Sequence, residues 1–530
     1  MIFPDLNFGD LLEAAADVMS DAPAVVQGDR LLSWRDLDTR ANRLTRALIS
    51  AGLEPGSKVA FYLRNSAAYV ELLTACSKGR FVHANVNYRY VDEELFHVLD
   101  NSDAEAVVYD SEFQPHLENL RSRFGKVRVF MEVGDAEAAS FAVPFESACS
   151  EGDPSRLGIE RSGEDLYFMY TGGTTGYPKG VMWEHKARIA AVGITDAGSV
   201  NEHRHKLLEQ GPGPFAMPAC PLMHSTGFTT AISTLINGGT LVLLPGRTFD
   251  AAECLEEIER HRVSRLAIVG DAFSVPILDH LAEHRRAHDL SSVAVITSAG
   301  AMWSEHCKRG LLEHFPNAML SDSLGSSEGS RLGSAITRRG ERTTTASFQV
   351  GEDVKVFTED FREVAPGSGE AGLIAKSGAL PLGYYKDPEG TAKTFPVVDG
   401  VRYSLAGDWC RIEADGSMTL LGRGNNCINT GGEKVFPEEV EEALKRAPGI
   451  YDAAVLGMPD PRWGQAVTAV VRTVGDLPLD EDAARAHLDA SLARYKHPKR
   501  ILPVTGELRH ENGKVNYRGV RRLVEAVGEG

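Results

Sequence analysis

The sequence predicts an α/β protein with a large N-terminal α/β domain of layered sheets and a small, mobile α+β C-terminal domain. Segments with helical periodicity alternate with short apolar or β-branched runs through most of the chain. This pattern changes after Arg423. Because 530 residues exceed what one hydrophobic core usually serves, two domains are expected, 1–424 and 425–530.

In the N-terminal domain, apolar residues recur at helical spacing in Phe8–Met19 and Ser33–Gly52, which predicts helices there. Strands are predicted at the short apolar runs Lys58–Tyr62, Ala106–Tyr109, Gly239–Leu244 and Ser292–Thr297. The runs Leu166–Tyr170 and Val181–Trp183 flank a glycine-rich loop. They predict a strand–loop–strand hairpin.

In the C-terminal domain, Pro437 begins a predicted helix that continues to Leu444, with acids in its first turn. Strands are predicted at Ala453–Gly457 and Ala466–Arg472, and a second helix at Glu481–Ala493. Alternating elements of this kind predict a compact α+β unit.

The composition is that of an ordinary globular protein, with 43% hydrophobic and 25% charged residues. A net charge of −18 argues against nucleic acid or an anionic membrane as the main partner. The seven cysteines are scattered, without a Cys-x-x-Cys pair or a zinc-like cluster, which predicts reduced thiols and a cytoplasmic location. We expect neither a signal peptide nor a transmembrane helix.

The loop between the hairpin strands, residues 171–180, has the composition of a phosphate-binding segment. Its glycines let backbone N–H groups approach an anion, three threonines add hydroxyl donors and Lys179 adds a charge. It is not a Walker loop, because Pro178 precedes the lysine and a strand follows it. The alternative is a surface hairpin rich in turn residues.

This loop, Thr-Gly-Gly-Thr-Thr-Gly-Tyr-Pro-Lys-Gly, resembles the signature of the acyl-adenylate-forming enzymes, which include acyl-CoA synthetases, luciferases and peptide-synthetase adenylation domains. Further family-like motifs follow in order at 322–329, 403–408, 422–437 and 513–514, so the resemblance covers nearly the whole chain. The amino-acid sequences of several segments most resemble those of bacterial fatty-acyl and sterol side-chain CoA ligases.

The resemblance implies four catalytic residues: Lys514, Glu328, Thr175 and His224. Lys514 would bridge the attacking carboxylate and the departing phosphate oxygens. Glu328 would also be the Mg²⁺ ligand, and His224 would be a gate between the acyl pocket and the thiol channel. The implied nucleotide- and CoA-binding residues are Thr171, Gly172, Gly173, Thr174, Thr175, Gly176, Lys179, Ala299, Gly300, Ala301, Asp322, Ser323, Leu324, Gly325, Ser326, Ser327, Asp408, Arg423, Gly431, Gly432 and Glu433.

Each of these residues also has an ordinary structural interpretation. Glu328 alone would be a solvated loop acid, Asp408 a turn residue, and Lys514 one of 56 basic residues. The chain also departs from the family at several positions, with Gly172 where a serine is usual and Ala406 where a threonine is usual. Leu324 replaces a common aromatic beside adenine, and Asn425 replaces the usual acid or lysine at the hinge.

The acyl pocket implied by the resemblance comprises 224–228, 269–273 and 298–303. These segments are mostly apolar and small, and without a basic residue to pair a second carboxylate they favour a hydrophobic monocarboxylic acid. A fatty chain, a steroid side chain and an aryl acid all remain open. The basic cluster Arg494, Lys496, Lys499 and Arg500 is either an anchor for CoA phosphates or a solvated edge.

We therefore predict an ATP-dependent carboxylate–CoA ligase that uses ATP, Mg²⁺ and coenzyme A. The alternatives are an adenylating enzyme with an amine or carrier-protein acceptor and an inactive nucleotide-binding relative. Because Lys514 and the Gly431–Gly432 segment are needed at the same site in successive steps, the resemblance implies rotation of the C-terminal domain. The sequence does not fix the oligomeric state, and a homodimer is compatible with it.

Overall fold

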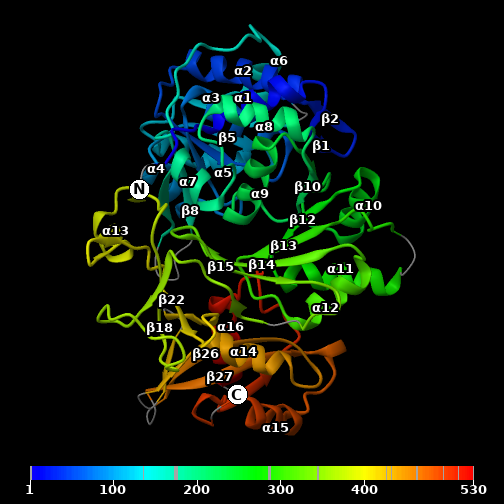
Figure 1. Ribbon diagram of the computed structural model, residues 1–530, viewed down its shortest axis with the longest axis vertical. Helices are drawn as coiled ribbons and strands as arrows, with labels where there is room; N and C mark the ends of the chain where they lie inside the picture. The colour runs from blue at the N-terminus through cyan, green and yellow to red at the C-terminus, as the bar shows by residue number, and fades with distance from the viewer. Residues whose placement is uncertain are drawn as a thin grey trace.

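The computed structural model in Figure 1 describes residues 3–134, 137–171, 177–284, 288–342, 345–424, 427–430, 433–460, 464–492, 494–510 and 513–528. Its helices are α1 (Phe8–Met19), α2 (Trp34–Ser50), α3 (Ala67–Gly79), α4 (Asp92–Asn101), α5 (Gln114–Leu120), α6 (Phe145–Ser150), α7 (His185–Val192), α8 (Val200–Gln210), α9 (Ser225–Ile236), α10 (Ala251–His261), α11 (Asp271–Glu283), α12 (Glu305–His314), α13 (Pro388–Thr394), α14 (Pro437–Lys445), α15 (Glu481–Ser491) and α16 (Tyr517–Gly528). Short 3-10 helices lie at Ser111–Phe113, Arg121–Arg123, Val474–Asp476 and Arg494–Lys496.

The first half of the chain supplies the strands β1 (Pro23–Gln27), β2 (Arg30–Ser33), β3 (Lys58–Tyr62), β4 (Val82–Asn85), β5 (Ala104–Asp110), β6 (Val129–Val133), β7 (Val143–Pro144), β8 (Leu166–Thr171), β9 (Lys179–Glu184), β10 (Phe215–Pro218), β11 (Thr240–Leu243) and β12 (Arg265–Ile268). The second half supplies β13 (Val295–Ala299), β14 (Met319–Ser326), β15 (Ser330–Thr337), β16 (Ser347–Phe348), β17 (Val354–Phe357), β18 (Gly372–Lys376), β19 (Gly383–Tyr384), β20 (Val397–Val398), β21 (Val401–Arg402), β22 (Asp408–Ile412), β23 (Met418–Arg423), β24 (Ile428–Thr430), β25 (Glu433–Val435), β26 (Ile450–Asp460), β27 (Gly464–Thr473) and β28 (Arg500–Pro503).

Two eight-stranded, mostly parallel sheets dominate the N-terminal part. One runs β15-β14-β13-β12-β10-β11-β1-β2 and the other β19-β9-β8-β4-β3-β5-β6-β7. A five-stranded sheet, β16-β23-β22-β18-β17, follows, and β24 to β28 form a separate C-terminal sheet at the bottom of Figure 1. The predicted α/β class with a small C-terminal α+β domain is therefore confirmed, whereas the boundary at 424–425 stays a prediction.

Most predicted elements are confirmed, including the antiparallel β8–β9 hairpin around the glycine-rich loop. Several predicted ends are shifted by up to three residues, and two of these shifts have a local cause. The strand expected from Ser292 begins at Val295, because Val293 N–H closes a turn onto the Leu290 carbonyl. The helix expected to reach Ala493 ends at Ser491, because Leu492 has extended backbone angles.

An aromatic layer fixes four elements around the middle of the N-terminal part. Phe8 of α1 stacks on His185 of α7 with ring centroids 4.1 Å apart, and Tyr167 of β8 stacks on Phe228 of α9 at 4.9 Å. Offset ring contacts of this kind add stability beyond the apolar area that they bury. The layer therefore sets α9 against the glycine-rich hairpin.

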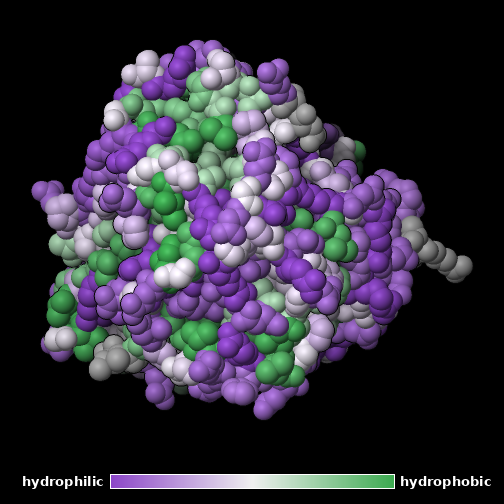
Figure 2. All heavy atoms as spheres, turned by 90° about the horizontal axis from the view of Figure 1, so that it is seen from above, coloured by the Kyte–Doolittle hydropathy of each residue, from purple (hydrophilic) through white to green (hydrophobic). Residues whose placement is uncertain are grey.

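The face seen from above in Figure 2 is mostly hydrophilic, and its hydrophobic residues form small, separate patches. None of the described helices has the length and apolar character needed to cross a bilayer.

A buried ion pair ties α12 to the first sheet. Lys308 Nζ lies 2.6 Å from Asp322 Oδ2, with side chains that are 1% and 9% exposed. Burial raises the pKa of Asp322, and the neighbouring ammonium opposes that rise. Both charged groups are thus buried, and each compensates the charge of the other.

We expect Asp322→Asn to lower the free energy of unfolding by about 3 kcal/mol, because it removes the carboxylate partner of a buried ammonium. Urea unfolding measures the loss. The matched control is Asp21→Asn, which breaks an exposed pair with Arg35 and should cost less than about 1 kcal/mol. Equal losses in the two variants would contradict the assigned role of the buried pair.

Candidate active site

The glycine-rich hairpin forms one wall of the candidate site. Thr171 is the last residue of β8 and pairs with Lys179 of β9. Lys179 Nζ lies 2.6 Å from Asp387 Oδ2 and 5.1 Å from the ring centre of Tyr384. The predicted residues Gly172, Gly173, Thr174, Thr175 and Gly176 lie outside the described part of the chain. Their proposed contacts with phosphate stay predictions.

The turn between β14 and β15 forms the facing wall and is tied to the first by two hydrogen bonds. Trp183 Nε1 donates to the Ser327 carbonyl at 2.8 Å, and the Tyr384 hydroxyl donates to Glu328 Oε1 at 2.9 Å. The Gly329 N–H donates to Ser326 Oγ at 2.9 Å. The structure therefore brings together two predicted motifs that lie about 150 residues apart in the sequence.

The neighbouring strand brings the predicted adenine segment to the same place. Ala299 pairs with Ser323 in parallel register, so 299–301 and 322–325 lie side by side. Gly325 has no room for a side chain, since a Cβ there would lie 2.5 Å from the Ser330 carbonyl oxygen. Leu324 packs against the core of the third sheet, and Asp322 faces Lys308 as described above.

The predicted ribose and hinge residues lie on adjacent strands. Asp408 is 6% exposed at the start of β22, and its backbone pairs with that of Arg423 in β23. Glu433 begins β25 and pairs with Thr430, while Gly431 and Gly432 lie outside the described residues. The predicted side-chain roles of Arg423 and Glu433 also stay untested.

The segment that carries Lys514 docks onto the N-terminal part. Gly513 has φ +77°, and a Cβ at this residue would lie 3.1 Å from Ala272 Cβ and 3.3 Å from the Val269 carbonyl oxygen. Glycine tolerates both the left-handed backbone and this close approach. Lys514 is thereby placed beside the predicted acyl-pocket segment 269–273.

His224 lies where these parts converge. It precedes the first residue of α9, and among the described residues no hydrogen-bond partner reaches its Nε2. Burial, together with the positive charges of Lys514 and Arg89, lowers the pKa of His224 to about 3. The imidazole is therefore neutral at physiological pH.

Asn85 links this histidine to the glycine-rich hairpin. Its Oδ1 accepts from the Tyr170 N–H at 2.7 Å, and its Nδ2 donates to the Met223 carbonyl. Asn85 is 2% exposed at the end of β4. One buried amide thus sets the end of β8 against the residue that precedes His224.

Sequence reasoning missed several of these residues. Arg89, Tyr384, Asp387 and Asn85 belong to loops or strand ends far from the recognised motifs. The predicted basic cluster is only partly open, and its role as an anchor for CoA phosphates stays a prediction. Lys496 is 7% exposed and bound to Glu439 at 2.6 Å, so it does not belong to an open basic edge.

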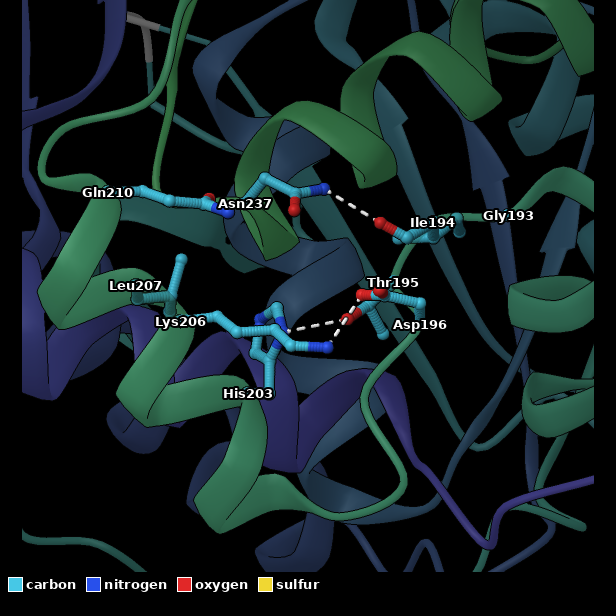
Figure 3. Close-up of a pocket in the computed structure, with 9 residues that line it drawn as sticks. All are labelled: Gly193, Ile194, Thr195, Asp196, His203, Lys206, Leu207, Gln210 and Asn237. Carbon is cyan, nitrogen blue, oxygen red and sulfur yellow. Dashed lines mark hydrogen bonds and ion pairs between the residues drawn. The ribbon is translucent and has the colours of Figure 1, made fainter.

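The cavity in Figure 3 is separate from this site. Its volume is about 170 Å³, and it lies between α8 and the C-terminal end of α9. His203 meets Thr195 Oγ1 at 3.1 Å and the Ile236 carbonyl at 2.9 Å, and Lys206 binds Asp196 at 2.7 Å. The polar groups that line it are therefore bound to one another, and none is a predicted site residue.

The arrangement suits an anionic substrate. Lys179, Arg89 and Lys514 supply positive charge around the convergence of the loops, and Glu328 supplies one carboxylate. A single carboxylate beside hydroxyls suits Mg²⁺, which keeps waters and takes phosphate oxygens as ligands. Within the described residues no group of three or more potential metal ligands is present.

Comparison with known proteins identifies the family. The model of the AMP-binding enzyme family matches residues 12–385, and that of the AMP-binding enzyme C-terminal domain matches 439–514. The chain belongs to the AMP-binding enzyme family. The resemblance inferred from the motifs is confirmed.

Curated relatives in this family are similar over their full length. A 3-oxocholest-4-en-26-oate–CoA ligase from Rhodococcus rhodochrous is 37% identical, over 97% of this chain and 95% of that protein. A medium/long-chain-fatty-acid–CoA/3-oxocholest-4-en-26-oate–CoA ligase from Mycolicibacterium smegmatis is 38% identical, over 98% and 97%.

Solved structures share the fold at lower identity. The anthranilate CoA ligase AuaEII in complex with anthranoyl-AMP has a TM-score of 0.86 at 22% identity, covering 100% of this chain and 99% of that one. The amide bond synthetase McbA from Marinactinospora thermotolerans has a TM-score of 0.81 at 23% identity, covering 97% and 99%. At these identities the likeness concerns the fold alone.

We expect His224 to stay neutral from pH 5 to pH 8, because its pKa of about 3 lies well below this range. Replacing Lys514 with methionine removes a positive charge and should raise that pKa toward the ordinary value of 6.5. Nitrogen-15 NMR of the imidazole measures both. His185, whose pKa burial alone lowers to about 3, is the internal control and should not respond. Wild-type titration of His224 near pH 6.5 would contradict the described burial.

Proposed function

We propose that the chain is an ATP-dependent carboxylate–CoA ligase. It adenylates a hydrophobic carboxylic acid, such as a fatty or steroid side-chain acid, and then transfers the acyl group to coenzyme A. Support comes from the two curated relatives, whose names give CoA ligation of such acids over nearly their whole length. The observation that carries the proposal is the docking of the Lys514 segment onto Val269 and Ala272, near enough for the lysine charge to act on His224.

In the first step a carboxylate oxygen attacks the α-phosphorus of ATP, a new P–O bond forms, and the bond to pyrophosphate breaks. Negative charge accumulates on the phosphate oxygens, so catalysis depends on positioning and on charge stabilisation. We assign this stabilisation to Lys514, with Lys179 and the glycine-rich loop on the phosphates. Mg²⁺ held by Glu328 would neutralise phosphate charge when bound.

In the second step the CoA sulfur attacks the acyl carbon and AMP leaves. Because a neutral imidazole with a low pKa is a weak proton acceptor, we assign His224 the role of a gate between acid and thiol. The thiol would approach along the Gly431–Gly432 segment after the C-terminal domain rotates about the hinge at 424–425. Asp408 would bind the ribose hydroxyls.

Three further statements belong to the proposal. We propose Mg²⁺ as the metal, and a cytoplasmic location because all seven cysteines are free thiols. We also propose that the protein forms a homodimer, which light scattering can test by measuring the molar mass in solution.

The molecule that accepts the acyl group distinguishes a CoA ligase from an enzyme that transfers it to an amine or a carrier protein. The fold does not distinguish them, since an amide bond synthetase shares it. We expect AMP formation from a panel of fatty, steroid and aryl acids to rise at least about tenfold when CoA is added, with the acyl-CoA as product. AMP release that ignores CoA for every acid would favour an amine or carrier protein. ATP binding without pyrophosphate exchange would favour an inactive relative.

We expect Lys514→Ala to lower pyrophosphate release by about a hundredfold or more, because it removes the ammonium that stabilises the developing charge. The reaction of preformed acyl-AMP with CoA should persist, since the lysine serves only the first step. Rapid-quench assays of each half-reaction measure the two effects. Lys355→Ala, an exposed lysine paired with Glu363, is the control. Equal loss of both half-reactions would contradict the assignment.

A further inference from the structure

A buried guanidinium lies beside the candidate site and has no part in the proposed chemistry. Arg188 of α7 is 2% exposed. Its Nη2 donates to Ser225 Oγ at 3.0 Å and to Thr229 Oγ1, and its Nη1 donates to Ser330 Oγ at 3.2 Å. Its Cζ lies 5.3 Å from the ring centre of Trp183. All these partners are electrically neutral.

This charge lacks an anionic partner within the part of the chain that the structure describes. No ion pair of Arg188 is present there, and its buried Nε has no hydrogen-bond acceptor. The sequence of the glycine-rich loop, residues 172–176, contains no acidic residue. Burying a cation that has only neutral partners and one unused N–H donor lowers the stability of the fold. A bound ligand that accepts this hydrogen bond would offset the loss.

The position of Arg188 points to a ligand of the same site. Ser225 follows His224 at the N-terminal end of α9, and Ser330 follows the Glu328–Gly329 turn. The N-terminus of a helix carries partial positive charge, so a second positive group there is unfavourable without a negatively charged neighbour. Ser330 itself has φ +59°, a left-handed conformation that its contact with Arg188 helps to hold.

The face of α9 that Arg188 touches is polar and partly open. Its partly exposed residues carry hydroxyl groups and are Ser225, Thr226, Thr229, Thr230 and Ser233. The opposite face packs into the core through Phe228, Ile232 and Leu235. Figure 1 shows α7, α9 and the β14–β15 hairpin meeting at the middle of the molecule. A row of hydroxyls thus runs away from His224, with a guanidinium at its start.

We propose that Arg188 binds an oxygen atom on the acyl chain of the substrate, set apart from the carboxyl group that reacts. The inference rests on the proposed ligase function and narrows its substrate class to oxygenated acids. The oxygen belongs to a keto group or to a second carboxylate. Either accepts from the unused Nε–H, and a carboxylate also neutralises the buried charge.

This inference changes the substrate expected from the sequence. The predicted pocket segments contain no basic residue, which favoured a plain monocarboxylic acid. Arg188 lies outside those segments and contacts one of them through Ser225, which is 37 residues away. The mostly apolar pocket segments still favour a hydrophobic acyl chain, and Arg188 favours one that also carries an oxygen atom.

The test compares three acids of equal chain length: an unsubstituted acid, its oxo derivative and its dicarboxylic analogue. CoA-dependent AMP formation gives kcat and KM for each acid. We expect wild type to prefer at least one oxygenated acid over the unsubstituted one by roughly tenfold or more in kcat/KM, the effect of one hydrogen bond to a charged donor. Arg188→Met should bring that ratio to about one, mainly by raising KM for the oxygenated acid, and Arg188→Lys should keep part of it.

Controls separate binding from a purely structural role. Arg35→Met, which removes an exposed arginine paired with Asp21, should keep the wild-type ratio. Arg188→Gln keeps a hydrogen-bond donor without the charge and carries the test if the methionine variant fails to fold. Circular dichroism and calorimetric titration with ATP verify the fold of each variant.

Two results would overturn the inference while the ligase function stands. One is a wild-type enzyme that activates the unsubstituted acid and discriminates against both oxygenated acids. The other is an Arg188 variant that lowers kcat/KM for all three acids by the same factor, since that would show a structural role. If no acid of the broader panel supports CoA-dependent AMP formation, the proposed function fails and the inference falls with it.

Discussion

The hydrogen bond from Trp183 Nε1 to the Ser327 carbonyl, 2.8 Å long, is the contact on which the site depends. Trp183 belongs to one large sheet and Ser327 to the end strand pair of the other, so this bond joins the two sheets where their loops meet. The Tyr384–Glu328 hydrogen bond repeats the link from a neighbouring strand. Loops held from both sides can present donors to a ligand without large rearrangement, which is what charge stabilisation requires.

Positive charge is concentrated at this junction although the chain carries a net charge of −18. Lys514 and Arg89 both act on His224, and Arg188 lies under the same helix end. Such an uneven distribution would favour an anionic ligand at this junction. It also explains why His224 is neutral, since nearby cations and burial both disfavour the imidazolium.

The sequence predicted the fold class and the ordered motifs well, because helical periodicity and glycine-rich turns are local signals. Lys58–Tyr62 and Phe8–Met19 match the observed elements residue for residue. What it could not predict depends on contacts between distant residues. Asn85, Tyr384 and Arg188 gain their roles from partners 85, 56 and 142 residues away. Asp322 lies in a recognised motif, yet its carboxylate faces Lys308, which no local pattern reveals.

Two of the described contacts between the C-terminal domain and the N-terminal part are long ion pairs. Lys445 lies 3.7 Å from Asp271 and Arg446 lies 3.6 Å from Glu305, distances longer than those of the best ion pairs. Gly513 also approaches this part closely, and it has no side chain to interlock with Ala272. Long ion pairs and a backbone contact without interlocking side chains require little free energy to break. The docking is therefore compatible with the proposed release of the domain between the two chemical steps, and a bulkier residue at 513 should displace Lys514 from the 269–273 segment.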